Sequence, residues 1–217
     1  MMFLRSFTAA IFLCGCWSAS GQEPAADPDP SSGPFFLRLL PKGESGAFQP
    51  LTQSQRFHGY LTSTFNYFPV FTAAVAGLAS QSIDSPHEWG QGVQGWSKRF
   101  ANNLARTAIR NTMTYGASAA IREDDRYFLS GKKGFWPRTA YALKSTVLAR
   151  RPDGSRSFAY ARMGAGFGTS TLSRIWAPPS WRGMKNASTD FSIWLSVEAG
   201  LNFGREFAPD MKRHFRR

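Results

Sequence analysis

The longest helical pattern in the chain, over residues 93–121, constrains its fold more than any other feature. Apolar side chains recur there in steps of four, from Trp96 through Phe100 and Leu104 to Ala108. This spacing places them on one face of a helix. A helix of this length must bury such a face against neighbours, so the pattern predicts a packed helical domain. The opposite side carries the basic residues that we expect to face outward: Lys98, Arg99, Arg106 and Arg110.

An uncharged region over residues 59–83 precedes this helix. Pro69 divides it, which predicts one helix over residues 53–68 and a second over residues 69–82 with Pro69 in its first turn. The second is rich in alanine and glycine, and such small residues let another helix approach closely, in water or in a membrane. We favour a packed core helix, and a membrane-embedded helix is the alternative.

Further helices are indicated after residue 121. Pro137 opens one that we expect to end at Arg150 and Arg151, because basic residues suit a helix C-terminus. Residues 188–190 cap a last helix, which Pro209 ends or kinks. Between these two, residues 158–176 fit either a strand or a glycine-rich helix, and we favour the helix because its neighbours are helical. The predicted fold class is therefore all-α, a single domain of about five helices.

The N-terminal region is typical of an export signal rather than of a folded segment. Residues 1–5 are basic, residues 7–16 are apolar but too short to span a bilayer, and small residues follow up to Gly21. We therefore predict a signal peptide over residues 1–21. The final Cys16 of Leu-Cys-Gly-Cys also resembles the lipidated residue of a bacterial lipobox. A lipid anchor there is an alternative that we do not favour, because cysteine is unusual at the second position of that motif.

The organisation of the remaining chain follows from its composition. Residues 22–34 consist mainly of Pro, Ala, Asp and Ser, which predicts a flexible leader. Residues 35–217 then form a helical envelope domain that ends in a basic tail. Both cysteines, Cys14 and Cys16, lie in the signal, so the mature domain has neither a disulfide nor a cysteine metal ligand.

Positive charge is concentrated in the middle of the chain. The formal net charge is +12, and residues 98–185 alone hold 17 Lys and Arg against 4 Asp and Glu, a net +13. Such a block favours anionic partners, here an anionic membrane surface or a cell-wall polymer. Nucleic acid is not an expected partner, because the export signal separates the protein from it. No oligomeric state follows from these features.

The glycine-rich stretch over residues 90–95 matches the pattern GxGxxG. That fingerprint binds dinucleotides only between a buried strand and a helix, with an acidic residue about twenty positions later. Neither condition is met, so no cofactor is predicted and the glycines are interpreted as an entry to the long helix. Gly116, inside that helix, is expected to bend it or to mark close packing. The histidines, His58, His87 and His214, have no metal-ligand spacing, so no metal site is predicted.

Two acidic positions are candidates for catalysis. Glu88 and Asp124 could act as the carboxylate pair of a glycan hydrolase, in which one acid protonates the leaving oxygen and the other serves as base or nucleophile. The favoured alternative is structural pairing, of Glu88 with Arg99 and of Asp124 with Arg122 or Arg126.

Three short segments carry a resemblance to a known family. Residues 88–92 read Glu-Trp-Gly-Gln-Gly, residues 124–128 read Asp-Asp-Arg-Tyr-Phe, and residues 206–210 read Glu-Phe-Ala-Pro-Asp. With Gly95 and Arg99, they resemble a family of exported, uncharacterised bacterial proteins over about residues 50–211. In that family, Pro usually replaces Asp125 and Trp usually replaces Ala208, which argues against a catalytic role for either position. The resemblance implies one envelope domain and no particular activity.

The leading hypothesis is a non-catalytic cell-envelope protein that associates with a membrane surface through basic and aromatic residues. The alternatives are a cell-wall glycan hydrolase using Glu88 and Asp124, and an integral helical membrane protein built around residues 59–83. We expect the two ends of the long helix to form a structural hub that locks it to its neighbours. The hub consists of Glu88, Trp89, Gly90, Gly92, Gly95, Arg99, Asp124, Arg126 and Tyr127.

Overall fold

A computed structural model describes residues 43–46 and 48–214 of the chain. The predicted signal peptide, its Cys16, the leader and the last three residues of the basic tail lie outside these residues. The predicted all-α class is confirmed, with one small β-ribbon added. The helices are α2 (Gln53–Phe65), α3 (Tyr67–Ser82), α4 (Gly92–Ile121), α5 (Phe135–Val147), α6 (Tyr160–Leu172) and α7 (Met184–His214), and the strands are β1 (Leu148–Arg150) and β2 (Arg156–Phe158).

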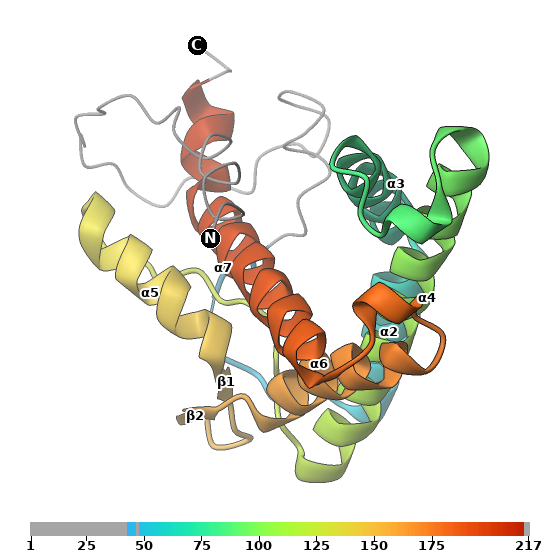
Figure 1. Ribbon diagram of the computed structural model, residues 1–217. Coiled ribbons are helices and arrows are strands. Elements are labelled where there is room, and N and C mark those ends of the chain that lie inside the picture. The colour runs from blue at the N-terminus through green and yellow to red at the C-terminus, as the bar shows by residue number, and fades with distance from the viewer. Residues whose placement is uncertain (1–42, 47, 215–217) are drawn as a thin grey trace.

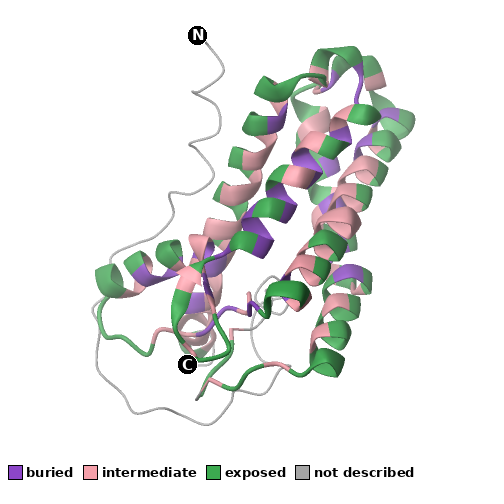
Figure 2. Cartoon of the chain, turned by 90° about the horizontal axis from the view of Figure 1, so that it is seen from below, coloured by how far each residue is buried: buried purple, intermediate pink, exposed green. Residues whose placement is uncertain are grey.

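The helices form two groups that α6 joins. Helices α2 and α3 pack on α4, whereas α5 packs on α7. Helix α6 packs against both α4 and α7, between the two groups (Figure 1). Buried residues accordingly lie on the inward faces of the helices, with exposed residues on the outside (Figure 2). Within the described part of the chain, no helix combines the length and apolar character needed to cross a membrane.

The central position of α6 depends on its small residues. A Cβ atom at Gly166 would lie within 3 Å of three ring atoms of Trp194 on α7, and one at Gly168 would lie 2.7 Å from the Cε of Met113 on α4. Glycine at both positions therefore lets α6 approach both neighbours closely. The helix favoured for residues 158–176 is confirmed for residues 160–172, and Phe158 belongs instead to β2.

The predicted long helix is α4, and its bounds match the sequence pattern closely. Its end is set by Arg122, which adopts a left-handed conformation with φ 55° and returns its N–H to the carbonyl of Ser118. The prediction of close packing at Gly116 is wrong, because no heavy atom lies within 4 Å of a Cβ built there. The close contact with α3 lies instead at Gly77, where a Cβ would be 3.3 Å from the backbone nitrogen of Phe100.

Several predicted helix ends differ from the structure. The first two helices divide at Asn66, whose side chain accepts a hydrogen bond from the N–H of Phe68 (3.4 Å), rather than at Pro69. Helix α7 begins at Met184, before the predicted cap at residues 188–190. It also continues past Pro209 to His214, and Arg138 binds Glu206 and Asp210, which lie on either side of that proline.

The largest difference concerns Arg150, which does not lie at a helix C-terminus. Helix α5 ends at Val147, and Arg150 lies in β1, which pairs antiparallel with β2. Arg150 also exchanges two backbone hydrogen bonds with Asp124, of 2.8 and 2.9 Å. The partners that make this segment extended are therefore distant in sequence, which is why the local helical pattern did not reveal it.

Candidate functional site

The two candidate catalytic carboxylates lie at opposite ends of α4. Glu88 precedes the helix and Asp124 follows it, and a helix of 30 residues is about 45 Å long at roughly 1.5 Å per residue. Hydrolysis by paired carboxylates needs a separation of about 5 to 10 Å. The geometry therefore does not bring Glu88 and Asp124 together, and the structural hub consists of two separate clusters.

The N-terminal cluster is organised around Arg99, whose side chain is only 1% exposed. Its guanidinium donates hydrogen bonds to three backbone carbonyls, those of Ser85 (3.1 Å), Pro86 (2.8 Å) and Gly90 (2.6 Å). It also lies 3.4 Å from a carboxylate oxygen of Asp84. Arg99 therefore holds the loop before α4 against the helix, and it does so without the predicted partner Glu88. Gly95 fits beneath this loop, since a Cβ there would lie 2.7 Å from the carbonyl carbon of Gly90.

Glu88 binds a different part of the chain. Its carboxylate accepts hydrogen bonds from the backbone N–H (3.0 Å) and the hydroxyl (2.7 Å) of Ser180. The hydroxyl of Ser180 is the main cause that lowers the pKa of Glu88, so the carboxylate is ionised and is poorly suited to donate a proton. The rings of Trp89 and Trp181 pack beside this contact at 5.7 Å. Glu88 and Trp89 thus tie the start of α4 to the 3-10 turn Pro179–Trp181.

The C-terminal cluster contains the predicted pair of Asp124 and Arg126. Asp124 is buried and accepts hydrogen bonds from the backbone N–H of Arg126 (3.1 Å), its Nε (3.1 Å) and its Nη2 (2.8 Å). The structural pairing of Asp124 expected from the sequence is therefore confirmed, with Arg126 as the partner. Because its carboxylate is occupied by one cation and removed from solvent, Asp124 has no open side for a reacting group.

Glu206, which sequence reasoning did not single out as a site residue, is the centre of a second part of this cluster. It is 1% exposed, and it accepts hydrogen bonds from the hydroxyl of Tyr127 (2.7 Å), the backbone N–H of Ser130 (3.1 Å) and the Nε of Arg138 (3.1 Å). The hydroxyl of Ser130 donates to it as well, and Arg138 also pairs with Asp210. Burial, together with the bond to Glu206, raises the pKa of Tyr127. Residues 124–128 and 206–210, two of the segments of the sequence resemblance, therefore meet in space.

Of the four basic residues of α4 expected to face outward, Lys98 is exposed, whereas Arg99, Arg106 and Arg110 are not. The side chain of Arg106 is only 12% exposed and pairs with Asp190 of α7 at 3.1 Å. Arg174 also pairs with Asp190, so one carboxylate serves two cations. The Nε of Arg106 is buried and has no hydrogen-bond partner in the described structure. Helix α4 packs against α3 and α6, and the expectation fails for the arginines that lie on these packed sides.

Arg110 is also turned toward the interior. Its guanidinium lies 5.1 Å from the ring centre of Trp194. Burial and the charge of Arg106 lower the pKa of Arg110 to about 10. Nearby, burial would raise the pKa of Glu198, but the charge of Arg205, which pairs with it at 2.9 Å, helps to hold that pKa below its ordinary value. Much of the central positive charge is thus internal.

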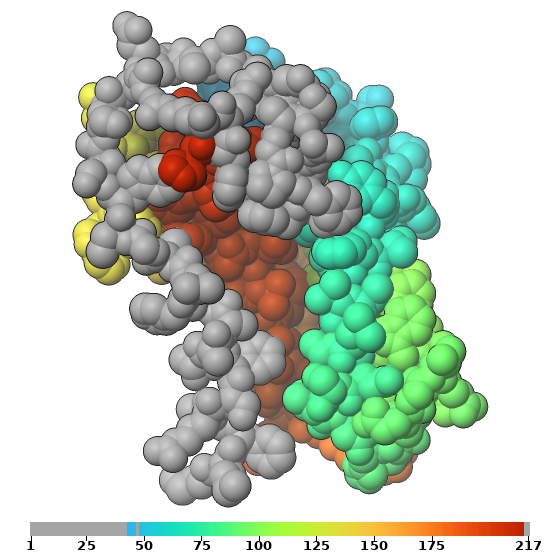
Figure 3. Space-filling view, turned by 90° about the horizontal axis from the view of Figure 1, so that it is seen from above, coloured from blue at the N-terminus to red at the C-terminus, as the bar shows by residue number. Residues whose placement is uncertain are grey.

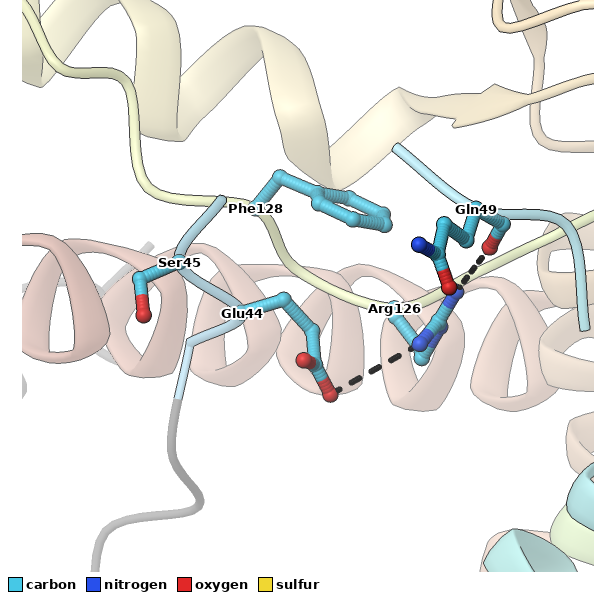
Figure 4. A pocket seen from close by; sticks show the side chains of 5 residues that line it. All are labelled: Glu44, Ser45, Gln49, Arg126 and Phe128. Atoms are coloured by element: carbon cyan, nitrogen blue, oxygen red, sulfur yellow. Dashed lines mark hydrogen bonds and ion pairs between the residues drawn. The ribbon is translucent and has the colours of Figure 1, made fainter. Parts of the chain in front are cut away.

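A hollow of about 350 Å³ opens beside Arg126 (Figure 4). In Figure 4, the guanidinium of Arg126 lies between Gln49 and Glu44, next to the ring of Phe128. Its Nη2 donates to the carbonyl of Gln49 at 2.8 Å, and its Nη1 is 3.8 Å from the carboxylate of Glu44. Arg126 is the hub residue that reaches an open depression. Lining residues that the sequence did not reveal are Glu44, Ser45, Gln49 and Phe128.

A second open surface runs along α2 and α3, where large apolar side chains are exposed. On α2 they follow steps of four, and on α3 they cluster on one side of the helix. Figure 3 shows α3, coloured blue-green, along one edge of the molecule. We call this surface the apolar stripe and define it by Phe57, Leu61, Phe65, Val70, Val75 and Leu78.

Over the described residues, no three His, Cys, Asp or Glu side chains gather where they could hold a metal ion. Comparisons with protein-family models, curated proteins and solved structures find no match.

Proposed function

We propose that this chain is a non-catalytic cell-envelope protein that lies on a membrane surface and inserts the apolar stripe into the head-group boundary. The apolar stripe is the observation that carries the proposal. It exposes Leu78 by 58% and Phe65 by 73% on two neighbouring helices. Several large apolar side chains exposed on adjacent helices of a folded protein are typical of a protein or membrane contact. Export and envelope location belong to the same proposal and depend on residues 1–21.

The lack of charge favours a membrane as the occupant. Residues 59–83 contain no Lys, Arg, Asp or Glu, so the stripe can enter the interface without taking a charge out of water. Burying one Val, Leu or Phe side chain fully is worth about 1.5 to 3 kcal/mol. Several half-exposed side chains together therefore supply a useful binding free energy. The net charge of +12 adds long-range attraction to anionic head groups.

Our proposal places the contact surface on the apolar residues of α2 and α3 rather than on the basic residues of α4. Arg99, Arg106 and Arg110, which we expected on an outward basic side of α4, instead bind carbonyls, a carboxylate and an aromatic ring inside the molecule. The other face of α3 packs on α4, with Ala73 and Gly77 buried. A helix held in this way can lie on a membrane while it stays part of the fold.

Flotation with lipid vesicles tests the proposal. We expect the protein to float with vesicles of mixed neutral and anionic lipid, and the double variant Val75→Asp/Leu78→Asp to stay in the bottom fraction. The matched control is Ala76→Asp, which adds a charge at an exposed position of α3 away from the stripe. Wild-type protein that does not float, or a double variant that floats as well as Ala76→Asp, would contradict the proposal. Fractionation of cells that express the full chain tests the envelope location separately.

A further inference from the structure

Two arginines lie directly opposite one another on the β-ribbon. Arg150 of β1 and Arg156 of β2 are register partners in the antiparallel pair. Directly opposed residues share one face of a ribbon, with their Cβ atoms about 4.5 to 5.5 Å apart, and like charges in such positions repel each other. Asp124 is the partner of Arg150 on its other side. A short row of side chains therefore runs from Arg156 through Arg150 to Asp124.

Neither arginine of this pair is neutralised by an acid. The guanidinium of Arg150 lies 4.3 Å from the ring centre of Phe128 and 5.3 Å from that of Phe48. The guanidinium of Arg156 lies 4.2 Å from the ring centre of Tyr141. Throughout the described residues, neither guanidinium has a hydrogen-bond acceptor or an ion-pair partner. The rings cover the guanidinium faces, so the N–H groups at the edges are available to a ligand.

The carboxylates of Asp124 and Glu44 do not cancel this charge. Asp124 is occupied by Arg126, and Glu44 lies across the larger hollow, half exposed and 3.8 Å from the same Arg126. Lys132 adds a further cation beside Tyr141, at 5.8 Å from the ring centre. The arginine pair therefore keeps an excess of positive charge.

The pair also lines a depression in the surface. A small hollow has walls that include Ser145 and Tyr141 in addition to the two arginines. It shares Arg126 and Phe128 with the larger hollow of Figure 4. The two hollows are thus neighbours, and three arginines are among the residues that line the smaller one.

We propose that Arg150 and Arg156 bind a phosphate group at the open mouth of this depression, because the depression itself, of about 20 Å³, is too small to enclose one. Arginine presents a planar fork of donors that matches phosphate oxygens, and stacking on aromatic rings holds the fork in place. A phosphate also removes the repulsion between the two opposed cations. The phosphate can belong to a lipid head group or to a soluble molecule, because both offer the same oxygens. This site is separate from the apolar stripe and does not depend on the proposed membrane attachment.

Calorimetric titration of the full chain with inorganic phosphate, at constant ionic strength, tests the proposal. We expect saturable binding that Arg150→Gln and Arg156→Gln each weaken roughly tenfold or more, since a hydrogen bond to a charged group is worth about 1.5 to 3 kcal/mol. The matched control is Arg151→Gln, which removes the same charge from the next, exposed residue of the chain. Unfolding midpoints of all variants should stay within a few degrees of the wild type, because removal of either cation relieves repulsion.

The titration decides whether phosphate binds at the arginine pair, and a vesicle assay then decides whether the phosphate belongs to a lipid. No phosphate binding by the wild type, or equal weakening by Arg151→Gln, would overturn the proposal. Retained binding in Val75→Asp/Leu78→Asp is expected, which keeps this site distinct from the apolar stripe. If binding is confirmed, vesicles of neutral lipid with and without phosphatidic acid identify the source. Stronger recruitment by phosphatidic acid that Arg150→Gln/Arg156→Gln abolishes assigns a lipid phosphate, and equal recruitment assigns a soluble one.

Discussion

The contact between Gly166 and Trp194 provides a sharp test of how α6 and α7 pack. A Cβ added at Gly166 would lie 2.8 Å from the Cε3 and 2.9 Å from the Cη2 of the indole, and closer still to its Cζ3. Carbon atoms in ordinary contact are about 3.5 to 4.0 Å apart, so the ring or the helix must shift by roughly an ångström. The ring has little freedom to shift, because Phe191 and the guanidinium of Arg110 pack on it.

The expected change in the free energy of unfolding for Gly166→Ala is the balance of two opposing effects. Overpacking in a core costs about 1 to 3 kcal/mol, whereas replacing glycine by alanine inside a helix gains up to about 1 kcal/mol. We therefore expect Gly166→Ala to lower the free energy of unfolding by about 1 to 2 kcal/mol. Gly164→Ala, two residues earlier on the exposed side of α6, meets no atom within 4 Å and should raise it by about 0.5 to 1 kcal/mol.

Urea unfolding followed by circular dichroism and tryptophan fluorescence measures both variants. The two changes have the same composition and the same helix propensity, so their difference reports the Trp194 contact alone. Thermal unfolding should give midpoints that differ by several degrees, since about 1 kcal/mol shifts the midpoint of a domain of this size by roughly 2 to 4 °C. If Gly166→Ala is as stable as Gly164→Ala, the indole is not seated against α6 and the packing described here is wrong.

Two further predictions concern the loops at the ends of α4. Burial raises the pKa of Glu123 above its ordinary value of 4.5, so the folded state binds this proton more tightly than the unfolded state does. The protonated carboxyl therefore favours the folded state at low pH, and this contribution to stability is lost as the pH rises through the raised pKa. Glu123→Gln should therefore raise the free energy of unfolding at neutral pH but not below the ordinary pKa, and an equal gain at both pH values in urea titrations would contradict this. Gly95→Ala should destabilise the protein by more than 1 kcal/mol, because its Cβ would meet the backbone of Gly90, whereas Gly116→Ala in the same helix should not. Equal unfolding midpoints for these two variants would show that Gly95 does not lie against the backbone of Gly90.

The long helix was predictable because its evidence is local. The apolar steps of four over residues 93–121 and the glycine-rich entry before them lie within one segment, and α4 matches them. Propensity and periodicity describe such segments well, because a helix makes its backbone hydrogen bonds with its own neighbours.

The site was less predictable because its partners are distant in sequence. Arg99 looks like an exposed basic residue of an amphipathic helix, and only the tertiary structure brings the carbonyls of Ser85 and Gly90 within reach of it. The local sequence around Arg150 likewise fits a helix C-terminus, although the backbone of Arg150 pairs with that of Asp124. The sequence carried one signal for Glu206, the Glu-Phe-Ala-Pro-Asp segment of the resemblance, but no local pattern assigns it a partner.

The Glu206 cluster and the proposed phosphate site are physically connected. The ring of Tyr127, whose hydroxyl donates to Glu206, packs edge-on against Tyr141 at 6.2 Å, and Tyr141 supports the guanidinium of Arg156. Because Glu206 lies on α7 and Tyr141 on α5, the packing of these two helices sets where the ribbon presents its arginines. Two of the three segments of the resemblance thus act as a support for the arginine pair, and the third holds the far end of α4. This arrangement gives the buried carboxylates a structural role and leaves the open guanidinium groups and the apolar stripe as the surfaces available for binding.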